Sequence, residues 1–320
     1  MTVTTQRPSA AEQRRARRPR PSGGRSAPPR GRSLIGYGRG WWILPGVLLV
    51  LGIHYGATSV GGFFAFTDWS GIGSFEWIGL ENFREIFQDP QKLRALGNTL
   101  FLAFGSVLLT NVFGLALALA LNRGLRTRYT LRVLFFMPVV LSPLAVAYVW
   151  KFVFDYNGPL NQALAAVGLE EMQRAWLADP QLAIWAVLGV IVWQQTGIAM
   201  VIYLAGLASV PVEIEEAAAI DGASHWQRFL AVTVPSIRPA IAIATTLGLV
   251  NGLRIFDQIM ALTAGGPAGA TENLATEVYK EAFSLGQFGY GAALALLLTA
   301  VILASALLQQ YVTRDRSKES

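Results

Sequence analysis

Long apolar runs dominate the chain between residues 41 and 313. Four of them contain no Asp, Glu, Lys or Arg, at 41–66, 98–121, 181–210 and 282–313, and two more contain few charges. Each is long enough to cross about 30 Å of hydrocarbon, since a helix needs about 20 residues for that. The pattern predicts an all-α integral membrane protein with six transmembrane helices, at about 41–66, 98–121, 133–154, 181–210, 239–262 and 288–312.

The composition agrees with a bilayer as the solvent. Of 320 residues, 53% are hydrophobic and 14% are charged, which is too apolar for a soluble domain of this size. The chain has no cysteine, so disulfides, zinc–thiolate sites and cysteine nucleophiles are excluded. It also has no H-E-x-x-H pattern and no paired carboxylates within the spans, so we expect no metal site and no catalytic residue, and a membrane-embedded enzyme is the least favoured class.

Basic residues are distributed unevenly around the predicted spans. With the N-terminus placed in the cytoplasm, nineteen Lys and Arg fall on the cytoplasmic side and six on the other. The positive-inside rule then predicts a multi-pass protein of the bacterial cytoplasmic (inner) membrane with both termini cytoplasmic. The transmembrane domain at 40–313 follows an Arg- and Pro-rich tail at 1–39, expected to be disordered, and precedes a short tail at 314–320. The ten arginines of the first tail favour attraction to anionic lipid over nucleic acid binding.

The loop at 211–238 departs from this charge pattern, because it holds four acidic residues and only two arginines. Pro211 suits the first turn of a helix, and the glutamates that follow it favour a helix N-terminus. Asp221-Gly222 is a turn signal that leaves right-handed helical geometry. We therefore expect a second helix from about Ser224, closed by Pro235.

This predicted helix-turn-helix has an apolar face that includes Trp226 and Phe229, three residues apart. The face is too small to fold alone. Two interpretations remain open from periodicity alone: the loop docks on a protein partner, or it is an amphipathic helix lying on lipid headgroups.

A specific motif separates the two. Glu216-Ala217-Ala218, then Asp221-Gly222-Ala223, and then Val232-Thr233-Val234-Pro235 resemble the E-A-A-x-x-x-G-x9-I-x-L-P loop of binding-protein-dependent ABC import permeases, with Val in place of Ile and Leu. The chain from about 41 to 313 resembles the sugar-permease branch of that family, the maltose-type and glycerol-3-phosphate-type permeases, in its six-helix form. Further matching segments are Phe66–Ser70, Ile78–Phe83, Asn98-Thr99, Phe136–Pro138, Trp150, Asn161 and Thr263–Pro267.

The resemblance implies a type I ABC importer permease fold and a place in a larger complex. The implied partners are a second permease subunit, an ABC ATPase dimer, an extracytoplasmic solute-binding protein, the lipid bilayer and a sugar or related solute. The loop would be the helix that couples to the ATPase, through Glu216, Ala217, Ala218, Asp221, Gly222, His225, Trp226 and Phe229. No G-x-x-x-x-G-K-[ST] loop occurs, so the chain is expected to bind no cofactor, with ATP and Mg on the partner ATPase.

Polar residues within the spans are candidates for the solute path, because they are costly in lipid unless they line a cavity or meet a partner. Trp193, Gln194, Gln195 and Thr196 lie in the middle of the fourth span, where similar permeases contact solute. Their alternative role is hydrogen bonding between helices.

Asn251, Arg254 and Asp257 form a second group, in the fifth span. Arg254 and Asp257 are three residues apart, so on one helix face they would pair. A structural or gating role is favoured, and contact between Arg254 and an anionic solute is the alternative.

A channel or ion-coupled secondary transporter is the rival function. It would need a relay of intramembrane charges, and Asp257 is the one acidic residue within the predicted spans. Trp, Gln and Thr in the fourth span favour a mono- to oligosaccharide as the solute, while polyols, glycerol phosphates and amino sugars fit almost as well.

Overall fold

The computed structural model describes residues 42–122 and 125–315. The predicted tail at 1–39 and residues 316–320 lie outside the described residues, whereas residues 314 and 315, predicted as part of the second tail, belong to a helix. The chain forms two units, residues 1–56 and 57–320. In the described part of the first unit, α2 (Leu44–Val50) continues into the π-helix η2 (Leu51–Gly56).

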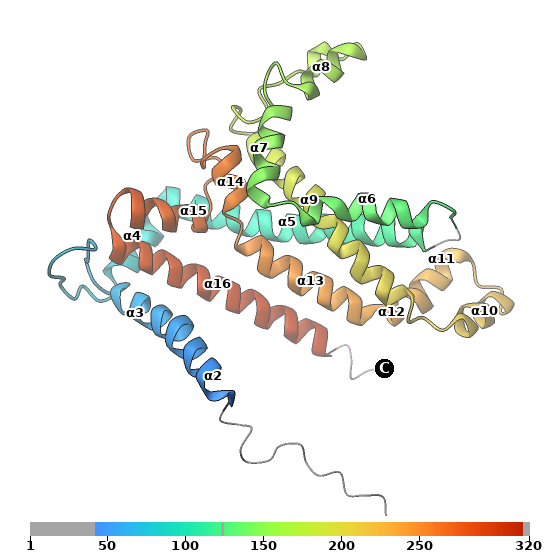
Figure 1. The fold of residues 1–320 in the computed structure, drawn as a ribbon, viewed down its shortest axis with the longest axis horizontal. Helices are drawn as coiled ribbons and strands as arrows, with labels where there is room; N and C mark the ends of the chain where they lie inside the picture. Colours follow the sequence, from blue (N-terminus) through green and yellow to red (C-terminus); the bar gives the residue numbers. More distant parts are fainter. Residues whose placement is uncertain (1–41, 123–124, 316–320) are drawn as a thin grey trace, which may run out of the picture. The chain divides into compact units, whose positions relative to one another are not determined.

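Four long helices organise the second unit: α5 (Pro90–Leu121), α9 (Ala183–Leu207), α13 (Arg238–Leu253) and α16 (Phe288–Asp315). Helix α5 packs on both α9 and α13, and α16 packs on α13 (Figure 1). Asp89 caps α5 by accepting from the backbone N–H of Gln91, and Pro90 occupies the first turn, where a missing N–H costs nothing.

The shorter elements of this unit are helical too. Outside them, the isolated pairing of Thr67 with Trp77 is the one β-bridge among residues 42–122 and 125–315. The short helices are α3 (Ala57–Phe64), α4 (Glu81–Gln88), α6 (Arg128–Val140), α7 (Pro143–Val153), α8 (Pro159–Ala166), η3 (Glu170–Met172), α10 (Val212–Ile220), α11 (His225–Arg228), η4 (Phe229–Thr233), α12 (Val234–Ser236), α14 (Asp257–Leu262), α15 (Leu274–Tyr279) and η5 (Lys280–Ser284).

The described helices include four that are long and apolar enough to cross a membrane: Leu44–Phe64, Pro90–Leu121, Ala183–Leu207 and Phe288–Tyr311. Two bent helix pairs raise the number to as many as six, if each pair is one span. The predicted all-α membrane fold is confirmed, and the predicted spans 133–154 and 239–262 are each interrupted.

The predicted third span, 133–154, is not a straight helix. Helix α6 ends at Val140 and α7 begins at Pro143, with a bend of 100° between them (Figure 1). Ser142 precedes the proline and is extended, with ψ at 132°, because the proline ring disfavours helical geometry in the residue before it.

The predicted fifth span, 239–262, is also interrupted. Helix α13 ends at Leu253, and α14 begins at Asp257 after a short non-helical stretch. At its other end, α13 follows the helical run His225–Ser236 at an angle of 68°. Pro235 therefore does not close the loop helix as predicted: it lies in the first turn of α12, where proline is tolerated, and the chain bends after Ser236.

Helices α6 and α9 approach each other closely. A Cβ added to Gly197 on α9 would lie 2.4 Å from the carbonyl oxygen of Phe135 on α6, so this contact admits only glycine. Such close approach through small residues is typical of helix pairs in membranes, where van der Waals packing replaces the hydrophobic drive of water. Met200 and Tyr203, on the following turns of α9, are buried in the same core cluster.

We expect Gly197→Ala to destabilise the folded chain by about 1–3 kcal/mol, because the new methyl group forces the α6–α9 contact apart. The measurement is the thermal unfolding midpoint of the purified protein in detergent. Gly189→Ala is the matched control on α9, since nothing lies within 4 Å of its Cβ position. Equal midpoints for both variants would contradict the packing account.

Candidate functional site

The segment 211–237, called the elbow below, forms the helix-turn-helix that the sequence predicts. Helix α10 ends at Ile220, Gly222 takes the left-handed conformation with φ at 81°, and α11 starts after Ser224. Ser224 and Gln227 form a capping box, with Ser224 N donating to Gln227 Oε1 at 2.8 Å and Gln227 N donating to Ser224 Oγ at 3.3 Å. Glycine at the turn and the cap after it together set the angle between the two short helices.

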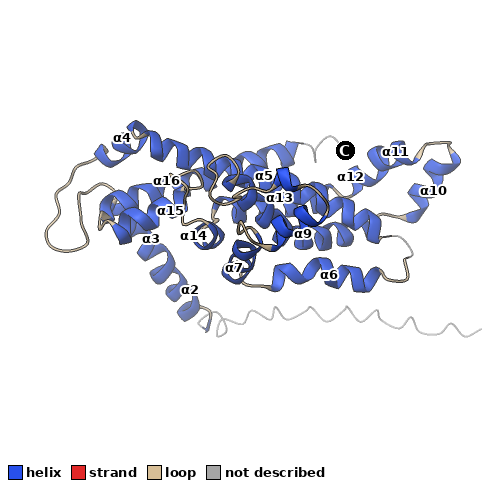
Figure 2. Cartoon of the chain, turned by 90° about the horizontal axis from the view of Figure 1, so that it is seen from above, coloured by secondary structure: helices blue, strands red, loops and turns tan. Residues whose placement is uncertain are grey.

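The elbow lies at one end of the long helices, where α10 and α11 lie beyond α12 in both views (Figures 1 and 2). None of the residues of α10 is buried. Ile220 is 87% exposed and Trp226 is 67% exposed, and Val212 and Ile214 are exposed as well. An apolar surface of this kind on a short, protruding element marks a place for a partner or a lipid surface.

The predicted coupling residues are collected on this elbow. Glu216, Ala217 and Asp221 are exposed on α10 and its C-terminal end, and Ala218 is partly buried. On α11 and η4, the rings of Trp226 and Phe229 stack with centroids 5.4 Å apart, and His225 is exposed. The elbow therefore brings all eight predicted positions onto α10, the turn after it, α11 and the start of η4: Glu216, Ala217, Ala218, Asp221, Gly222, His225, Trp226 and Phe229.

A hollow of about 650 Å³ lies inside the elbow, between α10, α11, η4 and the end of α5. Thr233 Oγ1 donates to Glu215 Oε1 at 3.3 Å, and the Arg228 guanidinium donates to His225 Nδ1 at 2.7 Å. Leu119 of α5 lines the same hollow. The last turn of α5 thus borders the hollow of the elbow.

The mid-span residues of α9 divide into two groups. Gln194 is buried, with 5% exposure, and its amide donates to the carbonyl of Leu141 at 2.9 Å and accepts from Gln258 Nε2 at 3.2 Å. Leu141 is the C-terminal cap of α6, so Gln194 supplies a partner to a carbonyl that the bend leaves without one. This geometry favours the helix-packing alternative for Gln194.

The neighbours of Gln194 are more open. Trp193 is 43% exposed and meets Trp150 edge to face at 5.4 Å, while Gln195 and Thr196 are half-buried. Trp193 and Thr196 form part of one wall of an apolar groove of about 790 Å³ between α5, α6 and α9. Trp193, Gln195 and Thr196 are therefore accessible for contact with another molecule.

Asn251, Arg254 and Asp257 are exposed but do not form the predicted pair on one helix face. The helix breaks between them, since Arg254 caps the end of α13 and Asp257 opens α14. No ion pair joins Arg254 to Asp257 among the described side chains. The three residues stand at the break, at the surface of this chain.

Sequence reasoning missed one polar cluster entirely. Lys92, Glu277 and Glu281 are buried and in contact, although 185 residues separate the first two. Their sole signal in the sequence is a lysine next to the predicted second span and two glutamates before the sixth. Nothing in such spacing identifies the partners.

Comparison with known proteins identifies the type of fold that carries the elbow. Residues 110–318 match the family described as "Binding-protein-dependent transport system inner membrane component". The chain is 37% identical over 266 residues to the multiple sugar-binding transport system permease protein MsmF of Streptococcus mutans, an alignment that covers 82% of this chain and 91% of that protein. It is 33% identical over 261 residues to the probable starch degradation products transport system permease protein AmyD of Thermoanaerobacterium thermosulfurigenes, covering 81% and 88%.

The fold of the chain is also similar to that of a solved structure. The chain resembles one from a bacterial alginate ABC transporter in complex with an alginate pentasaccharide-bound periplasmic protein, with a TM-score of 0.76 and 25% identity. The alignment covers 88% of this chain and 96% of that one.

We expect Gln194→Leu to destabilise the chain by about 1–3 kcal/mol, because the substitution leaves the buried Leu141 carbonyl and Gln258 amide without their partner. Gln195→Leu is the control on the adjacent position, since no hydrogen bond of its side chain occurs among the described residues. Thermal unfolding of the two purified variants checks this. An undiminished midpoint for Gln194→Leu would rule out the packing role.

Proposed function

This chain belongs to the family of binding-protein-dependent transport system inner membrane components, in its sugar-permease branch, and on that premise we propose that it moves a sugar or related solute into the cytoplasm with energy from a partner ATPase. The observation that carries the proposal is the elbow: a capped, glycine-hinged pair of short helices that projects from the long helices and exposes Ile220 and Trp226. The described part of this chain does not cover these apolar side chains, so they are free to contact a partner.

The elbow is the proposed contact with the ATPase. Its exposed side chains offer an apolar surface with acidic residues beside it, which suits a groove on a folded protein better than lipid headgroups, because anionic headgroups repel Glu216 and Asp221. Movement of the ATPase would carry α10 and α11 as a body, since the Ser224–Gln227 capping box fixes the second helix to the turn.

Hydrolysis belongs to the partner in this account. The 320 residues contain no phosphate-binding G-x-x-x-x-G-K-[ST] loop, and ATP and Mg would be bound by the ATPase dimer. A second permease subunit and an extracytoplasmic solute-binding protein complete the proposed assembly. The resemblance to a transporter chain solved together with a periplasmic protein supports the latter.

Orientation follows from the elbow and from charge. If the elbow meets an ATPase, its end of the bundle faces the cytoplasm, which is also the side on which the sequence places most Lys and Arg. Both termini would then be cytoplasmic in a multi-pass chain of the bacterial inner membrane.

The solute path is proposed to run past the open side chains of α9. Trp193 offers an aromatic face for a sugar ring, and Gln195 and Thr196 offer hydrogen-bonding groups beside it, while Gln194 acts behind them by holding the wall of the path. Asn251, Arg254 and Asp257 at the break between α13 and α14 would join the path, because exposed charges at that depth require water, solute or the second subunit as a partner. A mono- to oligosaccharide fits this mixture of aromatic and amide groups.

We expect Gly222→Val to abolish solute uptake while the protein still inserts into the membrane, because a β-branched residue at φ 81° is strained and changes the angle of the elbow. The measurement is uptake of labelled sugar by proteoliposomes that contain the whole transporter, together with the amount of this chain in the membrane.

Gly168→Val is the matched control, since Gly168 also has a positive φ, 76°, and open space around its Cβ position. It follows α8, which lies well away from α10 and α11 (Figure 1). Near-normal uptake is expected for it. Full uptake by Gly222→Val, or equal loss in both variants, would contradict the coupling role.

A further inference from the structure

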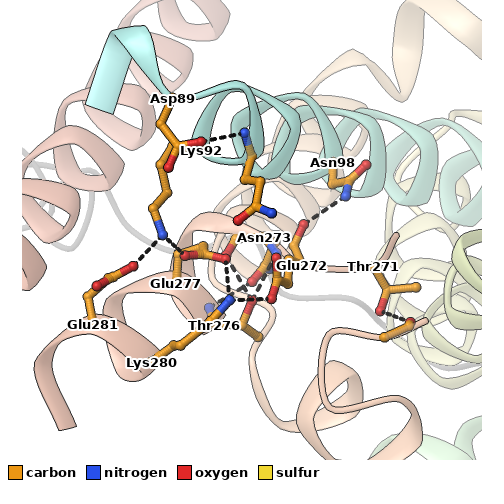
Figure 3. Close-up of polar contacts among 12 residues, drawn as sticks. Asp89, Lys92, Asn98, Thr271, Glu272, Asn273, Thr276, Glu277, Lys280 and Glu281 are labelled. Atoms are coloured by element: carbon orange, nitrogen blue, oxygen red, sulfur yellow. Dashed lines mark hydrogen bonds and ion pairs between the residues drawn. The ribbon is translucent and has the colours of Figure 1, made fainter. Parts of the chain in front are cut away.

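The first turn of α5 carries a buried cation. Lys92 is 4% exposed, and its ammonium group contacts Glu277 Oε2 and Glu281 Oε1, both of which are also buried (Figure 3). Glu277 lies on α15 and Glu281 on η5, in the segment 270–284 that precedes α16. Two carboxylates from one segment thus enclose a single cation from a helix far away in the sequence.

Neutral hydrogen bonds join the same segment to the same face of α5. The amide of Asn98 donates to the carbonyl of Ala270 at 3.1 Å and to that of Glu272 at 2.7 Å (Figure 3). The backbone N–H of Leu274 donates to Thr99 Oγ1 at 2.9 Å. Lys92, Asn98 and Thr99 therefore hold the segment at several points along the first three turns of α5.

A second ion pair extends the cluster within the segment itself. Lys280 Nζ lies 2.8 Å from Glu272 Oε1 and 3.6 Å from Glu277 Oε1. The hydrogen bond to Glu272 raises the pKa of the Lys280 ammonium. Burial favours the neutral form of Glu272, but hydrogen bonding to Lys280 and Glu277, together with the positive charges of Lys280 and Lys92, outweighs it and holds the pKa of the Glu272 carboxyl below its usual value. Both groups are therefore charged at neutral pH.

Separating the segment from α5 is unfavourable for a definite reason. Opening the contact partway would take the Lys92 ammonium away from both of its carboxylate partners. Glu281 would lose the cation that it contacts, and Glu277 would keep only Lys280, at 3.6 Å. An uncompensated buried charge costs more than its pairing gains. The contact therefore resists partial opening.

Helix α5 also reaches the elbow. It is a continuous helix of 32 residues, about 48 Å at 1.5 Å per residue, with Lys92 in its first turn and Leu119 of its last turn lining the hollow of the elbow. Its interior contains no proline, and the helix runs without a break between these two positions. Helix α5 therefore extends from the Lys92 contacts at its N-terminal end to the hollow of the elbow at its C-terminal end (Figure 1).

We propose that Lys92 is a positioning residue that makes the segment 270–284 move with α5 as one body, so that motion at the elbow reaches the far end of the permease. The attachment of the segment to α5 is inferred from contacts within this chain. The role of that attachment in transport rests on the proposed function. The segment carries the exposed rings of Tyr279 and Phe283, so their position follows α5.

Hydrogen exchange tests the attachment without any partner. The full chain in lipid nanodiscs is compared with the triple variant Lys92→Met, Glu277→Gln, Glu281→Gln. This variant removes the three charges together, so that none of them is left buried without its counterion. We expect amide exchange in 274–285 to accelerate at least tenfold while that of α9 is unchanged. Lys92→Arg should behave as the unaltered chain, and Lys151→Met, at an exposed lysine of α7, is the matched control. Unchanged exchange in 274–285, or equal acceleration throughout the chain, would overturn the proposal.

A crosslink tests the movement. Because the chain has no cysteine, Asn98→Cys with Glu272→Cys gives a single pair for a short bifunctional thiol reagent. In the assembled transporter, uptake after crosslinking should stay within about twofold of the same variant without reagent, since the two parts do not separate. Loss of uptake on crosslinking would overturn movement as one body. Absence of uptake from the unaltered transporter would instead refute the proposed function and leave the exchange result standing.

Discussion

Amide side chains hold several helix ends and the loops beside them. A carbonyl at a helix end has no partner in its own helix, and hydrocarbon offers none. Gln194 serves the carbonyl at the end of α6, Asn273 that of Ile255 at the break before α14, and Asn98 those of Ala270 and Glu272. Asn82 does the same for Ala65 and Thr67 after α3. The 100° bend between α6 and α7 and the break before α14 are thus fixed features with their own hydrogen bonds, in a mostly apolar chain.

The bends determine what the permease presents to other molecules. The turn after Ser236 sets the elbow at an angle to α13, and the break before Asp257 leaves Arg254 at the surface instead of inside a helix. Between these irregular parts, α5 runs unbroken from the hollow of the elbow to the segment 270–284. In the proposed function, such a continuous helix would carry a movement from the ATPase towards the solute path, because a flexible connection would absorb the motion.

Much of this arrangement could be predicted from the sequence, and the limit is physical. Uncharged apolar runs located the long helices, and Gly222 with the Ser224 cap located the elbow, because both signals are local. The apolar pattern predicts the spans 133–154 and 239–262 but gives neither the 100° bend before Pro143 nor the break at Arg254, since hydropathy measures apolarity and not direction. The sequence leaves two roles open for Gln194, solute contact and hydrogen bonding between helices, because its partner, a backbone carbonyl of another helix, has no sequence signature. The partners of Lys92 are 185 and 189 residues away, beyond any spacing rule.

The central claim is that the elbow binds a nucleotide-hydrolysing subunit, and site-specific photocrosslinking tests it most directly. A photoreactive amino acid at Ala218 of α10, in cells that express the whole transporter, should form a covalent product with the ABC ATPase, identified by mass spectrometry, whereas the same group at Gly168 should not. Products with phospholipid alone from Ala218 would contradict the account.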